Sequence, residues 1–171
     1  TAYLNLYVEA NLSIGEKVLL HAGASGVGTA AIQLLKYSKN PSFVTVGNAD
    51  KLRRCRDLGA DSGFVRHDGS FLDAVSEWSG KSGVDVILDP VGASYFSDNI
   101  SCLGIDGRLV LIGLLGGQST ELNMGFLMMK RISVIGSTLR ARALSVKADI
   151  MDRLKEGVWP RFESKEILPV I

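Results

Sequence analysis

The sequence predicts a doubly wound α/β fold, in which helices cover both faces of a parallel β-sheet. Six short apolar segments alternate with amphipathic segments of helical periodicity, and this alternation is typical of β-strand–helix–β-strand units. A glycine-rich turn at residues 22–28 lies directly between the first apolar segment and the first helical one. The alternation together with the position of the turn favours a sheet that binds a dinucleotide.

The expected elements follow one another without a tandem repeat. Runs of Val, Ile and Leu indicate the strands, and apolar residues that share one buried face, such as Ile32 and Leu35, indicate the helices. Gly59 and Gly80 mark helix ends, and helix-like sequence already begins near Tyr3. We expect strands at residues 18–21, 43–46, 64–65, 84–88, 108–112 and 132–135, and helices at residues 29–39, from a cap at Asn48 or Asp50 to 58, from a cap at Ser70 to 78, and at 95–103, 126–130 and 144–155.

Six strands joined in this way match the Rossmann fold, whose usual strand order is 3-2-1-4-5-6. We expect this nucleotide-binding domain to span residues 1–142, with an incomplete start, because helix-like sequence begins almost at Thr1. Residues 143–171 are expected to form a terminal helix and a linker that returns toward a domain outside this chain. Residues 159–171 fit the alternating pattern poorly, and both ends resemble cuts from a longer protein.

The composition argues against several classes of function. The chain has 19 Lys and Arg residues against 18 Asp and Glu residues, whereas proteins that bind nucleic acid through its phosphates usually carry a clear basic excess. We find no apolar run long enough to span a membrane and no signal peptide, so we expect a cytoplasmic protein. Cys55 and Cys102 match no zinc or redox spacing, and with only two histidines beside them we expect no structural metal.

The glycine-rich turn has the layout of a dinucleotide site. Gly23 permits the tight turn, and Gly28 lets the following helix pack close to the strand. Gly26 and the small Ser25 let the backbone approach a pyrophosphate, which the free N–H groups and the positive dipole end of the helix favour. The strict G-x-G-x-x-G pattern would need glycine at position 25, so Ser25 is part of the phosphate turn, the N-cap of the helix, or both.

The end of the second strand favours NADP over NAD. Folds that prefer NAD often have an Asp or Glu there to bind the ribose 2′-hydroxyl, but residues 45–48 carry no carboxylate. Asp50 is expected in the first turn of the next helix, where its charge suits the helix dipole. Lys51 either pairs with a 2′-phosphate or lies on a solvated helix face, and the two interpretations are evenly balanced. A solvated helix face is expected for Arg53, Arg54 and Arg56.

Residues 21–34, with the sequence HAGASGVGTAAIQL, resemble the zinc-independent quinone oxidoreductase branch of the medium-chain dehydrogenase/reductase superfamily, which includes zeta-crystallin. Further stretches agree in order and spacing, so the resemblance covers nearly the whole chain. The most similar subgroup is the one whose human member is induced by a tumour suppressor. These further stretches are residues 58–60, 87–92, 102–103, 106–108, 111–114, 139–142 and 167–169.

The resemblance implies hydride transfer from NADPH to a quinone or a related conjugated carbonyl. The catalytic residues would lie in a domain outside this chain, which alone is expected to bind NADP(H) without efficient turnover. Lys51 is implied at the 2′-phosphate, Arg66 stands where family members often carry a tyrosine on that phosphate, and Thr1 is implied beside the nicotinamide. The full set of implied cofactor-binding residues is Thr1, Ser25, Gly26, Val27, Gly47, Lys51, Arg66, Pro90, Val91, Ile112, Gly113, Leu114, Thr138 and Leu139.

The resemblance also implies an edge position for the sixth strand, so we expect a homodimer through Val134 and Ile135. Met124, Met128 and Met129 are open to two interpretations. They could line a quinone site, but such residues more often fill a core or a subunit contact, and we favour the latter.

Strand-end residues near the glycine turn are assigned supporting roles. Asp85 and Asp89 could be paired carboxylates for acid–base chemistry, but the position of Asp89 at a strand end favours positioning groups near the cofactor. His21 is expected to be structural.

Other functions remain as alternatives. The acceptor could be an enal or an enoyl thioester, which related reductases of the same superfamily reduce, or the protein could be a non-enzymatic relative that senses nucleotides or binds RNA. A short-chain dehydrogenase is disfavoured, since none of the four tyrosines is followed by lysine four residues later. A methyltransferase would need an acid after the second strand, which is also missing.

Overall fold

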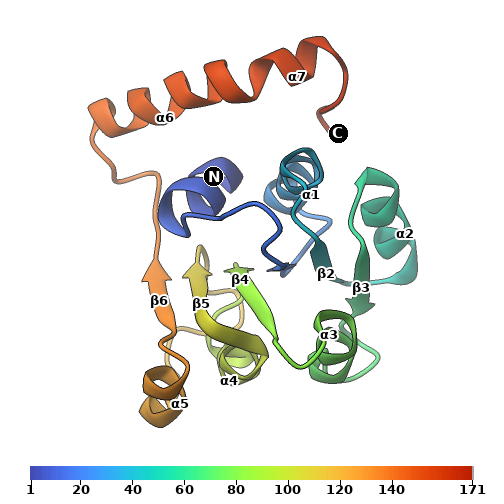
Figure 1. Ribbon diagram of the computed structural model, residues 1–171, viewed down its shortest axis with the longest axis vertical. Coiled ribbons are helices and arrows are strands. Elements are labelled where there is room, and N and C mark those ends of the chain that lie inside the picture. The colour runs from blue at the N-terminus through green and yellow to red at the C-terminus, as the bar shows by residue number, and fades with distance from the viewer. Residues whose placement is uncertain (171) are drawn as a thin grey trace.

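The computed structural model describes residues 1–170, which form a six-stranded parallel sheet with helices on both faces (Figure 1). The strands are β1 Val18–Leu20, β2 Ser42–Val46, β3 Ser62–Val65, β4 Val84–Asp89, β5 Leu103–Leu111 and β6 Ser133–Gly136. Their order is β3-β2-β1-β4-β5-β6, as the sequence predicts. Leu19 of β1 pairs with Phe43 of β2 on one side and with Ile87 of β4 on the other, so β1 lies in the middle of the sheet.

Two groups of helices cover the two faces of the sheet (Figure 1). Because successive side chains of a strand point to opposite faces, Val18 and Leu20 join one hydrophobic core and Leu19 joins the other. The first core lies under the π-helix η1 (Leu4–Glu9), α1 (Gly26–Ser38), α2 (Ala49–Leu58), α6 (Leu144–Gly157) and α7 (Trp159–Glu163). The second core lies under α3 (Leu72–Ser79), α4 (Ala93–Cys102) and α5 (Met124–Met129).

Side-chain caps determine where α1 and α2 begin. The Ser25 Oγ accepts a hydrogen bond from the Gly28 N–H at 3.1 Å, so α1 begins three residues earlier than expected. Asn48 rather than Asp50 caps α2, since its Oδ1 accepts from the Lys51 N–H at 2.9 Å. Asp50 lies in the first turn of α2, as predicted.

The starts of α3 and β5 also differ from the expected ones. The N-cap of α3 is Phe71 and not Ser70, whose Oγ instead accepts from the N–H of Leu72. Strand β5 begins at Leu103, five residues before the expected start, because Leu103 already pairs with Val84 of β4. The pairing then shifts register, and Asp106 has a positive φ of 61°, so this part of the strand is irregular and lacks an apolar run.

An ion pair holds the segment between η1 and β1 against β5. The Arg108 guanidinium donates two hydrogen bonds to the Glu16 carboxylate, at 2.9 and 2.6 Å, and a third to the Ala10 carbonyl at 3.0 Å. Both charged side chains are mostly buried, and a bidentate pair is stronger in such surroundings than on an open surface. Among residues 1–170, no helix has the length and apolar character that crossing a membrane requires.

The C-terminal segment packs along α1 (Figure 1). The buried side-chain amide of Gln33 donates to the Leu168 carbonyl at 2.9 Å and accepts from the Leu168 N–H at 2.8 Å. The Arg161 guanidinium lies 4.3 Å from the ring centre of Tyr37 and donates to its hydroxyl. Residues 159–170, which fit the strand–helix pattern poorly, therefore form the short helix α7 and a segment that packs on the surface of α1.

A pair of alanine substitutions tests the close packing of α1 against the turn before it. A Cβ at residue 28 would collide with the Gly23 carbonyl and lie 2.6 Å from the Ala22 carbonyl oxygen, so Gly28→Ala should lower the free energy of unfolding by about 2 kcal/mol. A Cβ at residue 26 would meet no heavy atom within 4 Å, so Gly26→Ala is the matched control and should change that free energy by less than about 0.5 kcal/mol. Urea unfolding followed by circular dichroism measures both, and equal stability of the two variants would contradict this account.

Candidate functional site

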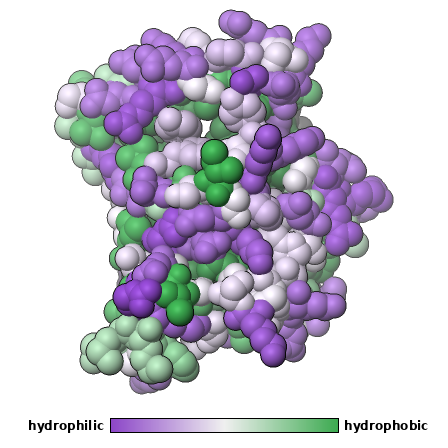
Figure 2. All heavy atoms as spheres, viewed as in Figure 1, coloured by the Kyte–Doolittle hydropathy of each residue, from purple (hydrophilic) through white to green (hydrophobic). Residues whose placement is uncertain are grey.

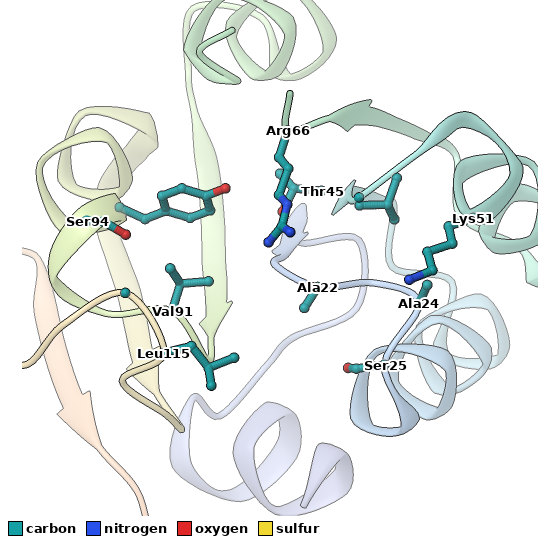
Figure 3. A pocket seen from close by; sticks show the side chains of 13 residues that line it. Ala22, Ala24, Ser25, Thr45, Lys51, Arg66, Val91, Ser94 and Leu115 are labelled. Atoms are coloured by element: carbon teal, nitrogen blue, oxygen red, sulfur yellow. The ribbon is translucent and has the colours of Figure 1, made fainter. Parts of the chain in front are cut away.

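A cleft of about 410 Å³ lies at the carboxyl end of the sheet, where β1 and β4 are neighbours and the strand order reverses. Open α/β sheets bind ligands at this switch point, because the connections of the two flanking strands leave in opposite directions. Figure 3 shows side chains from the segments that follow five of the strands around one common space. The lining residues are Ala22, Ala24, Ser25, Thr45, Val46, Gly47, Lys51, Arg66, Val91, Ser94, Tyr95, Leu115 and Gly116.

The turn after β1 offers backbone donors to a ligand. The Gly23 N–H donates to the Thr45 carbonyl at 3.0 Å, which fixes the turn against β2. Within residues 1–170, the N–H groups of Gly26 and Val27 have no acceptor, and they stand at the positive end of the α1 dipole. A Cβ at Gly26 or Gly47 would meet no protein atom within 4 Å, so these glycines leave open space that packing does not require. This arrangement can bind a phosphate group.

One wall of the cleft is basic. Lys51 comes from the first turn of α2 and Arg66 from the end of β3, where its N–H donates to the Val46 carbonyl at 2.9 Å. In Figure 3 both side chains extend into the cleft, Arg66 toward Ala22 and Lys51 toward Ala24. None of the thirteen lining residues is a carboxylate, so the two cations are available to an anion with no competing charge in the cleft.

The three arginines of α2 lie apart from this wall, as predicted. Arg53 pairs with Asp50 at 3.1 Å on the exposed face of the helix, and Arg54 and Arg56 are exposed and do not line the cleft. Of the four basic residues on α2, therefore, only Lys51 lines the cleft.

The opposite wall is formed by two loops that are hydrogen-bonded to each other. The Gly116 N–H donates to the Val91 carbonyl at 2.7 Å, and the Ser94 N–H donates back to the Gly116 carbonyl at 3.2 Å. The Ala93 N–H likewise donates to the Gly117 carbonyl at 3.0 Å. The first N–H groups of α4 are therefore already satisfied by the loop after β5, whereas those of α1 are free.

Four buried side chains connect the two walls through hydrogen bonds. The Thr45 hydroxyl lies 2.9 Å from Nδ1 of His21, and Nε2 of His21 lies 2.7 Å from the Asn99 Oδ1. The Asn99 Nδ2 donates to the Asp89 carboxylate at 3.0 Å. That carboxylate also accepts from the Val91 N–H at 2.6 Å and thereby holds the loop that follows β4.

Burial determines the protonation state of His21 in this hydrogen-bonded series. Desolvation lowers the pKa of His21 to about 4, against a small opposing effect of its hydrogen bond to Asn99, so the imidazole is neutral at pH 7. Its ring packs against the rings of Phe71 and Tyr95, with centroids 4.9 and 4.8 Å away, and the structural role predicted for His21 is confirmed. Burial also raises the pKa of Asp89, while its three hydrogen-bond donors act in the opposite direction.

A second cleft of about 430 Å³ lies between the residues that precede η1, the first part of α1 and the C-terminal segment. Thr1 and Gly26 line it, together with the half-exposed side chains of Trp159 and Phe162. The N-terminus of α1 therefore separates two clefts, with Ser25 facing the first and Gly26 facing the second.

The structure divides the predicted cofactor residues into three groups. Ser25, Gly47, Lys51, Arg66 and Val91 line the first cleft, and Thr1 and Gly26 line the second. The remaining ones line neither cleft, although most belong to the loops after β4, β5 and β6. These are Val27, Pro90, Ile112, Gly113, Leu114, Thr138 and Leu139.

Several lining residues were missed by sequence reasoning. Thr45 was read only as a strand residue, although its place one residue before the end of β2 could have suggested a cleft position. Ser94 and Tyr95 lie in the first turn of α4, which begins two residues earlier than expected. Nothing in the sequence singles out Leu115, since it lies in a loop. Asn99, which does not line the cleft but helps to connect its two walls, was missed as well, since a polar residue within an amphipathic helix is ordinary.

No three His, Cys, Asp or Glu side chains within residues 1–170 are close enough together to hold a metal ion. The chain therefore supplies no metal centre from its described residues, and the chemistry of the cleft comes from backbone N–H groups, two cations and hydroxyl groups.

Comparisons with known proteins agree with this geometry. Residues 26–156 match the family model described as zinc-binding dehydrogenase. The chain is 34% identical over 137 residues to quinone oxidoreductase-like protein 2 of Rattus norvegicus, which covers 80% of this chain and 39% of that protein. It is 39% identical over 116 residues to the lovastatin diketide synthase lovF of Aspergillus terreus, which covers 66% of this chain and 5% of that protein. Among solved structures, Escherichia coli quinone oxidoreductase complexed with NADPH superposes with a TM-score of 0.84 at 25% identity, over 99% of this chain and 53% of that one. The chain thus spans about half or less of the length of these relatives.

The neutral state of His21 predicts a dependence of stability on pH. The pKa of His21 is lower in the folded protein than in the unfolded chain, where it is near 6.5, so the unfolded state takes up a proton as the pH falls from about 6.5 to 4. The free energy of unfolding should therefore fall by about 3 kcal/mol over this range, beyond the change seen in His21→Gln, which cannot titrate. Urea unfolding of both proteins at several pH values gives the difference, in which the groups common to both cancel. Parallel curves for the two proteins would refute the prediction.

Proposed function

Because the chain belongs to the zinc-binding dehydrogenase family, within the medium-chain dehydrogenase/reductase superfamily, we propose that it is the NADP(H)-binding part of an oxidoreductase that transfers hydride from NADPH to a quinone or a related conjugated carbonyl. One observation supports the choice of cofactor above all. Lys51 and Arg66 enter the same cleft from two neighbouring strand ends, and no carboxylate accompanies them among the lining residues. A 2′-phosphate needs such a pair of cations, and an acidic residue at this place would repel it.

The backbone of the glycine turn fits the rest of the dinucleotide. In our proposal the pyrophosphate binds to the free N–H groups of Gly26 and Val27, with Ser25 beside it, and the adenosine ribose lies over Gly47. The open space at Gly26 and Gly47 supports this assignment, since a side chain at either position would meet the ligand and not the protein. The cofactor supplies the hydride when it is bound, and this chain binds it, orients it and keeps water away.

The nicotinamide half is assigned to the segments beyond the basic wall. We propose that it extends from the N-terminus of α1 toward Thr1, between the loops after β4, β5 and β6. The lining of the second cleft by both Thr1 and Gly26 supports this direction. The residues proposed along this half are Pro90, Val91, Ile112, Gly113, Leu114, Thr138 and Leu139.

The hydride acceptor is the least constrained part of the proposal. The similarity to a quinone oxidoreductase-like protein favours a quinone, and the subgroup related to the tumour-suppressor-inducible enzyme is our narrower proposal. The similarity to polyketide synthases such as lovF supports the alternative of an enoyl-thioester reductase with the same cofactor. A panel of quinones and enoyl thioesters, reduced with NADPH, separates the two, although we expect little turnover from this chain alone.

The name of the family refers to zinc, but the residues described here do not fit a zinc site, since no three potential ligands meet. We therefore assign no step to a metal ion and propose that this chain acts through the nucleotide alone. Binding of RNA is disfavoured by a net charge of +1, and a salt-dependent gel-shift assay tests it.

We propose that two copies of the chain pair through the exposed edge strand β6. Val134 is 39% exposed on this strand, and the neighbouring helix α5 also exposes apolar side chains, which contradicts their placement in the core. Figure 2 shows the pale green surface of this helix at the lower left of the molecule. An exposed apolar edge strand favours pairing with another strand. The exposed apolar residues of α5 are Met124, Phe126, Met128 and Met129.

Calorimetric titration with NADPH and NADH tests the cofactor assignment. We expect NADPH to bind more tightly, because only NADPH carries the phosphate that Lys51 and Arg66 can bind. Lys51→Ala should weaken NADPH binding about tenfold and leave NADH binding unchanged, since one charge-assisted phosphate contact is worth roughly 1.5 kcal/mol, and Arg66→Ala should act in the same direction. Arg54→Ala removes a cation of the same helix that lies outside the cleft and serves as the control. Equal affinity for both nucleotides in the unmodified chain would contradict NADP specificity.

Analytical ultracentrifugation tests the pairing of β6. We expect the unmodified chain to sediment as a dimer and Val134→Lys to sediment as a monomer, because a lysine on an edge strand opposes pairing. Val146→Lys introduces the same charge at a position of similar exposure on α6 and should leave the dimer intact. A monomeric unmodified chain at micromolar concentration would overturn the proposal.

A further inference from the structure

We propose that Asn99 is a positioning residue for the dinucleotide, which holds one wall of the cleft in place through Asp89 without touching the ligand itself. This inference rests on the proposed function, because it concerns how the same cleft binds NADPH. Asn99 lies in α4, is fully buried and does not line the cleft. Its side chain is nevertheless the central link of the hydrogen-bonded chain from Thr45 to Asp89.

The Asp89 carboxylate, at one end of this series of hydrogen bonds, determines which atom donates in each of them. The Asp89 carboxylate already accepts from two backbone N–H groups, so Asn99 must turn its Nδ2 toward it and its Oδ1 toward His21. The imidazole then carries its proton on Nε2 and donates it to the Asn99 Oδ1. Nδ1 of the neutral ring is left as an acceptor for the Thr45 hydroxyl proton. Each of these side chains therefore has a single orientation in which no partner is lost.

The carboxylate that Asn99 orients fixes the apolar wall of the cleft. Asp89 accepts from the Val91 N–H at 2.6 Å and from the Gly92 N–H at 3.1 and 3.2 Å. Val91 lines the cleft, and its carbonyl accepts from the N–H of Gly116, which lines the same wall beside Leu115. A movement of Asp89 would therefore shift both loops of this wall together, while the basic wall, which is built on other strands, would stay in place.

Of the side chains of this size, only an amide can form hydrogen bonds with both His21 and Asp89. It donates to a carboxylate on one side and accepts from an imidazole N–H on the other. An aspartate at position 99 would direct a second carboxylate at Asp89, and an alanine would leave both Asp89 and the His21 N–H short of a partner in a buried environment.

Two ligands of different length distinguish positioning from general stability. Adenosine 2′,5′-bisphosphate carries the 2′-phosphate and a 5′-phosphate, so in our assignment it contacts the basic wall and the glycine turn. NADPH also reaches the loops after β4 and β5. Loss of the Asn99 amide should therefore weaken NADPH binding more than binding of the shorter ligand, whereas a loss of folded protein would reduce the measured binding of both equally.

The experiment is calorimetric titration of the unmodified chain, Asn99→Ala and Asn40→Ala with both ligands, alongside thermal unfolding. Asn40 is the matched control, since it is also buried and its side-chain amide also forms hydrogen bonds, donating to the Ser13 and Glu16 carbonyls, but it lies before β2, at the amino end of the sheet and away from the cleft. We expect Asn99→Ala to weaken the binding of NADPH about tenfold and the binding of adenosine 2′,5′-bisphosphate less than threefold. Asn40→Ala should lower the melting temperature and leave both affinities unchanged.

Four results would overturn the inference. If Asn99→Ala weakened the binding of both ligands equally, Asn99 would have a merely structural role. The same would follow if Asn40→Ala weakened NADPH binding as much as Asn99→Ala does. Unchanged NADPH affinity in folded Asn99→Ala would remove the inference and leave the proposed function intact. Binding of neither ligand by the unmodified chain would instead refute the proposed function and the inference with it.

A measurement on the unmodified chain tests the arrangement even if Asn99→Ala fails to fold. Long-range ¹⁵N NMR of the His21 ring distinguishes its two neutral tautomers, and we expect the proton on Nε2. A proton on Nδ1 would mean that Asn99 directs its amide nitrogen at His21 and not at Asp89, which would overturn the inference.

Discussion

The cleft of this protein depends on one requirement, that a buried carboxylate be fully hydrogen-bonded. Asp89 is inaccessible to solvent at the end of β4, where an unpaired charge would be expensive. Its partners come from the following loop and from Asn99 of α4, and Asn99 in turn binds His21 after β1. The requirement therefore joins the ends of β1 and β4 to the helix α4, at the point where the strand order reverses.

A second feature, the unequal state of two helix N-termini, gives the cleft a direction. Both α1 and α4 begin at its rim, and an empty helix N-terminus attracts anions. The loop after β5 occupies the first N–H groups of α4 with the carbonyls of Gly116 and Gly117, whereas those of Gly26 and Val27 in α1 are free. Of the two N-termini, therefore, only that of α1 offers free N–H groups to an anion within the described residues.

The fold could be predicted from the sequence because the alternation of apolar strands and amphipathic helices is a local signal repeated six times. The start of β5 could not, since Gly104, Asp106 and Gly107 break the apolar run where the strand bulges. At the site, the glycine turn was readable from its position in that alternation, whereas the residues alone left Lys51 with two equal interpretations. Asn99 was not readable, because its partners are 10 and 78 residues away in sequence and only folding brings them together. The methionines of α5 do not fill a core, as hydropathy alone does not distinguish a buried face from an exposed one, and their place at a subunit contact stays a prediction.

The attachment of the C-terminal segment to α1 has a consequence for how this sequence can drift. Gln33 recognises residue 168 through main-chain atoms alone, in the manner of a neighbouring strand, while the Leu168 side chain is half exposed. The contact therefore places no requirement on the side chain at residue 168, except that proline is excluded because it has no N–H to donate. Position 33 has no such freedom, since glutamate would lose the donor and leucine would lose both partners. The contact by itself should accordingly conserve the glutamine at position 33 without linking its identity to that of residue 168, so covariation methods would overlook the pair.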